Sequence, residues 1–264
     1  LVGGVDDVSI ELAMAFYPRV IKQVHRVSSA EVAETAKLLE NIYRGVNIAL
    51  VNELKVVLTD MGIDIWEVIA AASTKPFGFQ AFYPGPGLGG HCIPIDPFYL
   101  TWKAKEIGRY TKFIELAGEI NKHMPEYVIG RVMMALNDEK VPRALRNAKV
   151  LVIGLAYKPN VDDCRESPAA EIIELLHKHG AEVNYHDPHV ADFPAMRKHD
   201  IDMTSLKLTP KNIAAQDVVL IVTDHDAIDY AALGKHARLI VDSRNAMSRA
   251  GGSPKSIKAR IVKA

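Results

Sequence analysis

The residues best suited to chemistry lie in one stretch rich in proline and glycine, Tyr83 to Phe98. Within it the thiol of Cys92 follows the imidazole of His91, and the carboxylate of Asp96 comes four residues later. Glycine lets backbone N–H groups approach a ligand closely, and a thiol beside an imidazole suits covalent catalysis. Because proline and glycine oppose helix and sheet, we expect the whole stretch to be a shaped loop. The alternative is a rigid connector whose cysteine is a small core side chain.

The glycines of this stretch, residues 85–90, also satisfy the dinucleotide pattern G-x-G-x-x-G. A true fingerprint follows an apolar strand and opens a helix. Residues 77–82 are instead aromatic and interrupted by glycine, and Pro94 and Pro97 follow the glycines. We therefore reject this stretch as an NAD site.

Length and composition predict two modest domains, since the chain has 264 residues, of which 48% are hydrophobic and 24% charged. The 32 basic residues balance the 32 acidic ones, so no net field favours nucleic acid or a membrane. The two cysteines lie far apart, and a signal peptide and long apolar runs are missing, which indicates a cytoplasmic protein. The start at Leu1, without an initiator methionine, leads us to expect a fragment.

Helical periodicity dominates the first half of the chain. We expect helices over 10–17, 98–105 and 113–137, and a long helix from Ser29 to Met61, roughly 50 Å if continuous. Ser29 can cap this helix, and Gly62 can end it. A helix of this length predicts a spine or a dimer seam.

Two polar residues of the long helix, Lys37 and Asn41, stand four apart and therefore project from one face. On this pattern alone they are ordinary solvated surface.

The second half alternates buried-strand runs with helical segments, which predicts βαβ units and a parallel sheet. The strand runs are 150–153, 181–185, 218–222 and 239–241, and a helix spans Ala169–His179. The change of pattern falls near Pro142, and the last dozen residues resemble a tail. We expect an α/β protein with an all-helical domain at 1–145 and a Rossmann-like parallel-sheet domain at 146–264.

Ligands of α/β sheets bind beyond the carboxyl ends of the strands. The first strand here exits toward Lys158, and the last one exits toward Arg244. Because the first exit lacks the glycine fingerprint, a nucleotide diphosphate held by these two cations is the better expectation.

Two further groups are weaker candidates for chemistry. His186, Asp187 and His189 lie close together, but no other cluster supports a metal centre, so we interpret them as a polar strand exit and assign no metal. Cys164 follows two aspartates that oppose its thiolate, which makes it the weaker nucleophile.

Four blocks together resemble the UDP-glucose/GDP-mannose dehydrogenase superfamily, and they cover essentially the whole chain. They are Lys37–Asn41, Gly89–Pro97, Gly154–Ser167 and Asp242–Asn245. Within that superfamily the stretch from Phe82 through Pro94 is most similar to UDP-N-acetylglucosamine 6-dehydrogenases.

This resemblance implies oxidation of a sugar C6 alcohol to a carboxylate, with two hydride transfers to two NAD molecules. By the family pattern, Cys92 attacks the C6 aldehyde to form a thiohemiacetal, which becomes a thioester and is hydrolysed. Lys37 and Asn41 match the pair that stabilises the developing oxyanion. Asp96 matches the carboxylate that orders the hydrolytic water or the lysine.

The resemblance also implies binding residues and partners. Substrate contacts are expected from Tyr83, Gly87, Gly89, Lys158 and Arg244, and a contact to NAD from Arg165. The family's N-terminal NAD domain is absent from the sequence, so we expect this chain to bind UDP or a UDP-sugar without turning it over. The family is typically dimeric, which suggests a homodimer. The rival interpretation is a non-catalytic UDP-sugar-binding or dimerisation module, although binding alone needs no thiol.

Overall fold

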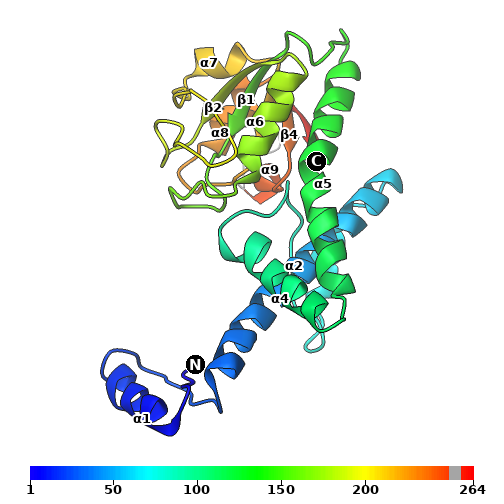
Figure 1. The fold of residues 1–264 in the computed structure, drawn as a ribbon. Helices are drawn as coiled ribbons and strands as arrows, with labels where there is room; N and C mark the ends of the chain where they lie inside the picture. Colours follow the sequence, from blue (N-terminus) through cyan, green and yellow to red (C-terminus); the bar gives the residue numbers. More distant parts are fainter. Residues whose placement is uncertain (250–256) are drawn as a thin grey trace.

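A computed structural model describes residues 1–249 and 257–264 of the chain. It shows a helical part followed by a five-stranded sheet in which all strands are parallel (Figure 1). The predicted fold class is thereby confirmed. No helix within the described residues is long and apolar enough to cross a membrane.

The helical part has five α-helices and a short 3-10 turn within the described chain. They are α1 (Asp7–Phe16), η1 (Tyr17–Arg19), α2 (Ala30–Asp60), α3 (Ile65–Ala72), α4 (Cys92–Glu106) and α5 (Lys112–Asn137). Helix α2 extends away from the sheet and carries α1 near its far end (Figure 1).

The spine helix α2 follows the prediction almost residue by residue. Its N-cap is Ser29, whose hydroxyl accepts a hydrogen bond from the Val32 amide at 3.3 Å. Glu31 lies in the first turn, where a negative charge favours the helix dipole. Just beyond the helix Gly62 takes a φ of +73°, the left-handed conformation that ends helices.

Two local expectations in this part were wrong. The stretch Tyr83–Phe98 is irregular only up to His91, and helix α4 already begins at Cys92. Pro94 is tolerated because it lies in the first turn, where amides have no intrahelical partner. Pro97 lies inside the helix and is buried. The short helix α3 was not predicted at all.

The sheet has the order β2-β1-β3-β4-β5. Its strands are β1 (Lys149–Ile153), β2 (Glu182–His186), β3 (Val218–Ile221), β4 (Leu239–Asp242) and β5 (Arg260–Lys263). The expected tail is wrong for the described residues 257–264, because β5 pairs with β4 along its full length. Residues 253–256 of that expected tail lie outside the described residues.

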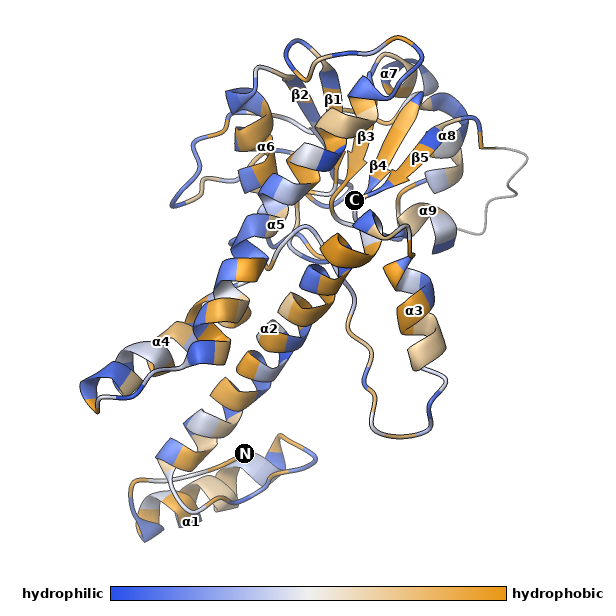
Figure 2. Cartoon of the chain, turned by 90° about the vertical axis from the view of Figure 1, so that its right-hand side faces the viewer, coloured by the Kyte–Doolittle hydropathy of each residue, from blue (hydrophilic) through white to orange (hydrophobic). Residues whose placement is uncertain are grey.

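Helices cover both faces of the sheet. On one face α5 and α6 (Pro168–Lys178) bury an apolar core that includes Val132, Val150 and Ile172. On the other face lie α7 (Pro210–Ala214), α8 (Tyr230–His236) and α9 (Ala246–Arg249). The central strands β3 and β4 between these layers are almost uniformly apolar (Figure 2). Helix α5 contacts α2 with one half and the sheet with the other, so it ties the two parts together.

Candidate active site

The glycine-rich loop lies across the carboxyl ends of strands β1 and β4. At one end Gly85 packs so closely on the Arg244 guanidinium, beyond β4, that a Cβ at this position would clash. At the other end a Cβ on Gly89 would lie 2.6 Å from Cβ of Tyr157, beyond β1. The amide of Gly90 donates to the carbonyl of Arg165 at 2.9 Å. The loop thus connects the two strand exits that the sequence pointed to.

Arg244 is held in place by its own strand exit. Its Nε donates to the carbonyl of Val222 at 3.1 Å and lies 3.6 Å from a carboxylate oxygen of Asp224. Its backbone amide donates to the Asp242 carboxylate at 3.0 Å. Burial lowers the pKa of Arg244 from its usual value. Among the residues that the structure describes, hydrogen bonds hold this guanidinium at Nε, so its terminal nitrogens could donate to an anionic group beside Gly85.

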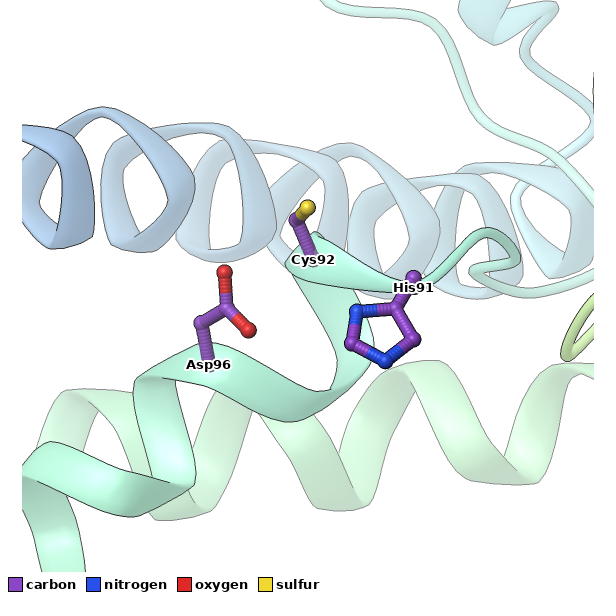
Figure 3. Close-up of side chains that lie close together, drawn as sticks. All are labelled: His91, Cys92 and Asp96. Atoms are coloured by element: carbon purple, nitrogen blue, oxygen red, sulfur yellow. The ribbon is translucent and has the colours of Figure 1, made fainter.

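Cys92 is the first residue of α4 and is exposed, so the alternative of a buried structural cysteine is wrong. Figure 3 shows its thiol beside His91 and Asp96, and the three potential ligand atoms lie within 4.8 Å of one another. Such a group could take a metal ion, although no metal was expected here. A thiol, an imidazole and a carboxylate this close can equally exchange protons and activate a nucleophile.

Asn41 and Asp96 form one unit across helices α2 and α4. The amide nitrogen of Asn41 donates to Asp96 at 3.1 Å, and its amide oxygen accepts from Arg44 at 3.0 Å. Asn41 is buried, so it is not the solvated surface residue that its helical spacing alone suggests. Lys37, by contrast, is exposed and pairs with Glu40 at 3.2 Å.

Lys158 is exposed at the β1 exit, with its ammonium 5.4 Å from the ring centroid of Tyr157. The backbone before it is fixed by Asp187, whose carboxylate accepts from the amides of Leu155 and Ala156 at 2.7 and 3.0 Å. The strand exit that carries Lys158 is therefore anchored by Asp187, which follows β2.

Asp187 belongs to a buried pair with His225, at 3.0 Å. The imidazole Nδ1 accepts from the amide of Asn160, so Nε2 carries the proton and donates to Asp187. Burial raises the pKa of Asp187, but hydrogen bonds from His225 and three backbone amides outweigh it and bring the pKa to about 2. The suggestion of a metal at His186, Asp187 and His189 has no support in the described residues.

Two other predicted residues have clear neighbours. Tyr83 stacks on Trp66 with ring centroids 5.6 Å apart and an interplanar angle of 13°. Gly87 takes a φ of +142°, which only glycine adopts readily, and so its identity is required by the loop. Both residues lie in the irregular part of the loop, where backbone groups can meet a ligand.

Arg165 lies exposed beside the loop and is bonded to Asp163, with an Nη2 to oxygen distance of 2.7 Å. Its pKa is raised chiefly by Asp163, with smaller contributions from Tyr157 and Cys92. An exposed guanidinium can bind an anionic group such as a phosphate once it leaves Asp163.

Cys164 is a poor nucleophile, as predicted. It is buried, and burial together with Asp187, Asp163 and Asp162 raises its pKa to about 12.

A cavity of about 490 Å³ lies behind the loop, between α2, α4, α5 and α6. Its wall includes Leu88, Ile93 and Pro94, but neither the Cys92 thiol nor Arg244. The Cys92 thiol and the Arg244 guanidinium therefore lie outside this cavity, whereas Gly87 lines it.

Sequence reasoning missed several residues that position the site. Asn52, Trp66 and His225 contact the loop or the strand exits, and Asn121 bonds Asn52. Asp187 was noticed only as part of a polar strand exit, without its bonds to the amides after β1. The available signal was polarity at an apolar position, since Asn52 and Asn121 lie on buried helix faces.

The fold and the site define an α/β protein in which a glycine-rich loop joins the exits of two parallel strands and ends at an exposed thiol. Family models make the assignment specific: residues 31–123 match the UDP-glucose/GDP-mannose dehydrogenase family, central domain, and residues 151–249 match the UDP binding domain of that family. The chain belongs to the UDP-glucose/GDP-mannose dehydrogenase family.

Comparison with individual relatives supports the same family assignment. The chain is 34% identical over 259 residues to a UDP-N-acetyl-D-mannosamine dehydrogenase of Methanocaldococcus jannaschii, covering 94% of this chain and 55% of the relative. It is 34% identical over 248 residues to the protein of that name in Escherichia coli, covering 92% and 57%. The structure of a UDP-D-ManNAc dehydrogenase from Pyrococcus horikoshii matches with a TM-score of 0.82 and 30% identity, covering 99% of this chain and 58% of that one. The chain thus spans little more than half the length of these relatives.

Proposed function

We propose that this chain is the substrate-binding, thiol-bearing part of an NAD-dependent dehydrogenase that oxidises the C6 alcohol of a UDP-N-acetylhexosamine to the uronic acid. The observation that carries the proposal is the loop that ends at the exposed thiol of Cys92 and contacts both strand exits. Binding of UDP is assigned to Lys158 and Arg244, and the sugar lies along Tyr83, Gly87 and Gly89.

The proposed reaction uses the side chains of this site in sequence. When bound in turn, two NAD molecules would accept the two hydrides, and the protons would pass to solvent. The alcohol loses a hydride and a proton to become an aldehyde, to which the Cys92 thiolate adds. Loss of a second hydride converts the thiohemiacetal into a thioester, and water releases the carboxylate and the thiolate. Asp96, oriented by Asn41, is assigned to the hydrolytic water. Lys37 stabilises the oxyanion once it exchanges Glu40 for the substrate.

The sugar epimer is the finer part of the proposal. The sequence resemblance pointed to UDP-N-acetylglucosamine, whereas the relatives described above are named for N-acetylmannosamine. Both sugars offer the same C6 alcohol, so the assigned residues serve either one. We take UDP-N-acetylmannosamine as the first substrate to test and UDP-N-acetylglucosamine as the second.

The direct test is Cys92→Ser in the complete protein, assayed for uronic acid and NADH with both sugars. We expect acid formation to fall roughly a thousand-fold or more, because serine is a far weaker nucleophile near neutral pH. Cys164→Ser is the matched control and should leave the rate within about threefold. Acid formation by Cys92→Ser at a rate near that of the unaltered protein would refute the nucleophile assignment.

A second candidate, a non-catalytic UDP-sugar-binding or dimerisation module, is favoured by the exposed apolar side chains of α2. The two functions differ in what they require of the thiol. A catalyst places the sugar against Cys92, so a bound UDP-sugar protects the thiol from alkylation, whereas a mere dimerisation module leaves it unprotected.

A further inference from the structure

Two buried asparagines lie beneath the glycine-rich loop. Asn52, in α2, is 0% exposed, and Asn121, in α5, is 4% exposed. A buried amide costs free energy unless it is hydrogen-bonded, so their partners indicate what the pair does.

The two amides form one directional chain of hydrogen bonds. The backbone amide of Gly85 donates to Oδ1 of Asn52 at 2.9 Å, and Nδ2 of Asn52 donates to Oδ1 of Asn121 at 2.9 Å. Nδ2 of Asn121 then donates to the carbonyl of Gly45 at 3.1 Å. Because the chain starts at an obligatory donor and ends at an obligatory acceptor, only one orientation of each side chain satisfies all four groups.

This chain of hydrogen bonds fixes one end of the glycine-rich loop, and a different hydrogen bond fixes the other end. Gly85 is tied to α2 and α5 through Asn52, while Gly90 donates to the Arg165 carbonyl at 2.9 Å. Cys92 follows two residues after Gly90. The backbone leading to the thiol is therefore held at Gly85 by side chains of two helices and at Gly90 by the backbone of the β1 exit.

We propose that Asn52 and Asn121 are positioning residues for the Cys92 reaction, acting through the amide of Gly85. The inference rests on the proposed function and adds to it the device that orients the loop. Covalent attack requires the reacting atoms within near-attack distance, and a displacement of about 1 Å can cost on the order of a hundredfold in rate. Arg244, the cation assigned to the nucleotide, keeps its own bond to the Val222 carbonyl, so it is not held in place by the pair.

The test uses Asn52→Leu in the complete protein, because leucine has a similar volume and cannot bond Gly85. We expect kcat to fall roughly thirtyfold while KM for the UDP-sugar stays within about threefold. Amide exchange measured by mass spectrometry should become at least about tenfold faster in peptides covering residues 83–91. Asn52→Asp keeps an acceptor for Gly85 and should retain more of kcat than Asn52→Leu.

Asn47→Leu is the matched control, since Asn47 lies in the same helix and, within the described part of the chain, its side chain bonds only the Tyr43 carbonyl of that helix. Unchanged kcat and unchanged exchange in folded Asn52→Leu, or an equal loss in Asn47→Leu, would overturn the proposal. Should Asn52→Leu not fold, Asn52→Ala carries the same test, and failure of both to fold would overturn it in favour of a purely structural pair. If the unaltered protein oxidises neither sugar, the proposed function fails, yet the exchange measurement still decides whether Asn52 holds the loop.

Discussion

At the scale of single residues, the two cysteines of this chain are in opposite situations. Cys92 is exposed at the start of a helix, beside His91 and Asp96. Cys164 is buried, and its raised pKa of about 12 leaves roughly a thousandfold less thiolate at pH 8 than an ordinary cysteine has. Their reactivity therefore separates a site residue from a core residue without any assay of turnover.

Iodoacetamide at pH 8 should accordingly label Cys92 and leave Cys164 unlabelled in the folded protein. Peptide mass spectrometry after a short exposure measures both sites, and labelling in denaturant, where both react, is the control. A saturating UDP-sugar should slow the labelling of Cys92 by at least about tenfold, because it occupies the space in front of the thiol. Labelling of Cys92 that is indifferent to every UDP-sugar tested would favour the non-catalytic module.

At the scale of elements, Asp187 joins the ends of neighbouring strands. It follows β2, accepts from the amides of Leu155 and Ala156 after β1, and pairs with His225 after β3. Its pKa of about 2 is below the value near 3.9 of an unfolded aspartate. A lowered pKa stabilises the fold above the unfolded value, and that stabilisation is lost as the pH falls through about 4 toward 2.

Asp187→Asn should therefore lower the free energy of unfolding by roughly 2 to 3 kcal/mol at pH 7. The difference from the unaltered protein should shrink between pH 4 and pH 2, where the aspartate takes up its proton. Urea unfolding at pH 7, 5, 4 and 3 measures this, with the exposed Asp202→Asn as a control expected to stay within about 0.5 kcal/mol. A difference that does not vary with pH would show that the carboxylate charge contributes nothing.

The elements themselves were largely predictable from the sequence. Helix α2 has unbroken helical periodicity and a clear N-cap, and strands β1, β3 and β4 are short apolar runs. Local rules therefore predicted where each of these elements lies. The errors have local causes too. Proline in a first turn was counted against α4, and the edge strand β5 has only four residues, partly exposed, that become a strand by pairing with β4.

The candidate site was predictable only in its residue types. The thiol loop and the cations of two strand exits stand out in the sequence, and the structure brings the loop to both exits. The supporting contacts do not stand out, because Asn52 meets Asn121 across 69 residues and Asp187 meets His225 across 38. Long-range pairing of this kind depends on tertiary packing, which the spacing of residues along one helix or strand does not reveal.

At the scale of the whole molecule, α2 leaves a long apolar stripe uncovered. Its last turns present side chains at intervals of four, three and four residues, which places them on one helix face. The exposed members of this stripe are Leu50, Leu54, Val57 and Met61. Figure 2 shows how far the helix extends beside the rest of the chain. A stripe spaced in this way is typical of helices that pair, and covering it with a second copy would remove apolar surface from water.

We therefore predict that the protein is a dimer at micromolar concentration and that α2 forms its seam with the α2 helix of a second copy. Leu54→Asp places a charge in the middle of the stripe, where a twofold axis would bring two such charges together, so it should shift the protein to monomer in sedimentation velocity. The control is Val141→Asp, which introduces the same charge at an exposed apolar position in the connection after α5, outside the stripe. It should leave the dimer intact. If the unaltered protein sediments as a monomer at tens of micromolar, the stripe has another occupant and the twofold seam is wrong. If both variants dissociate equally, added negative charge accounts for the effect and α2 loses its special role.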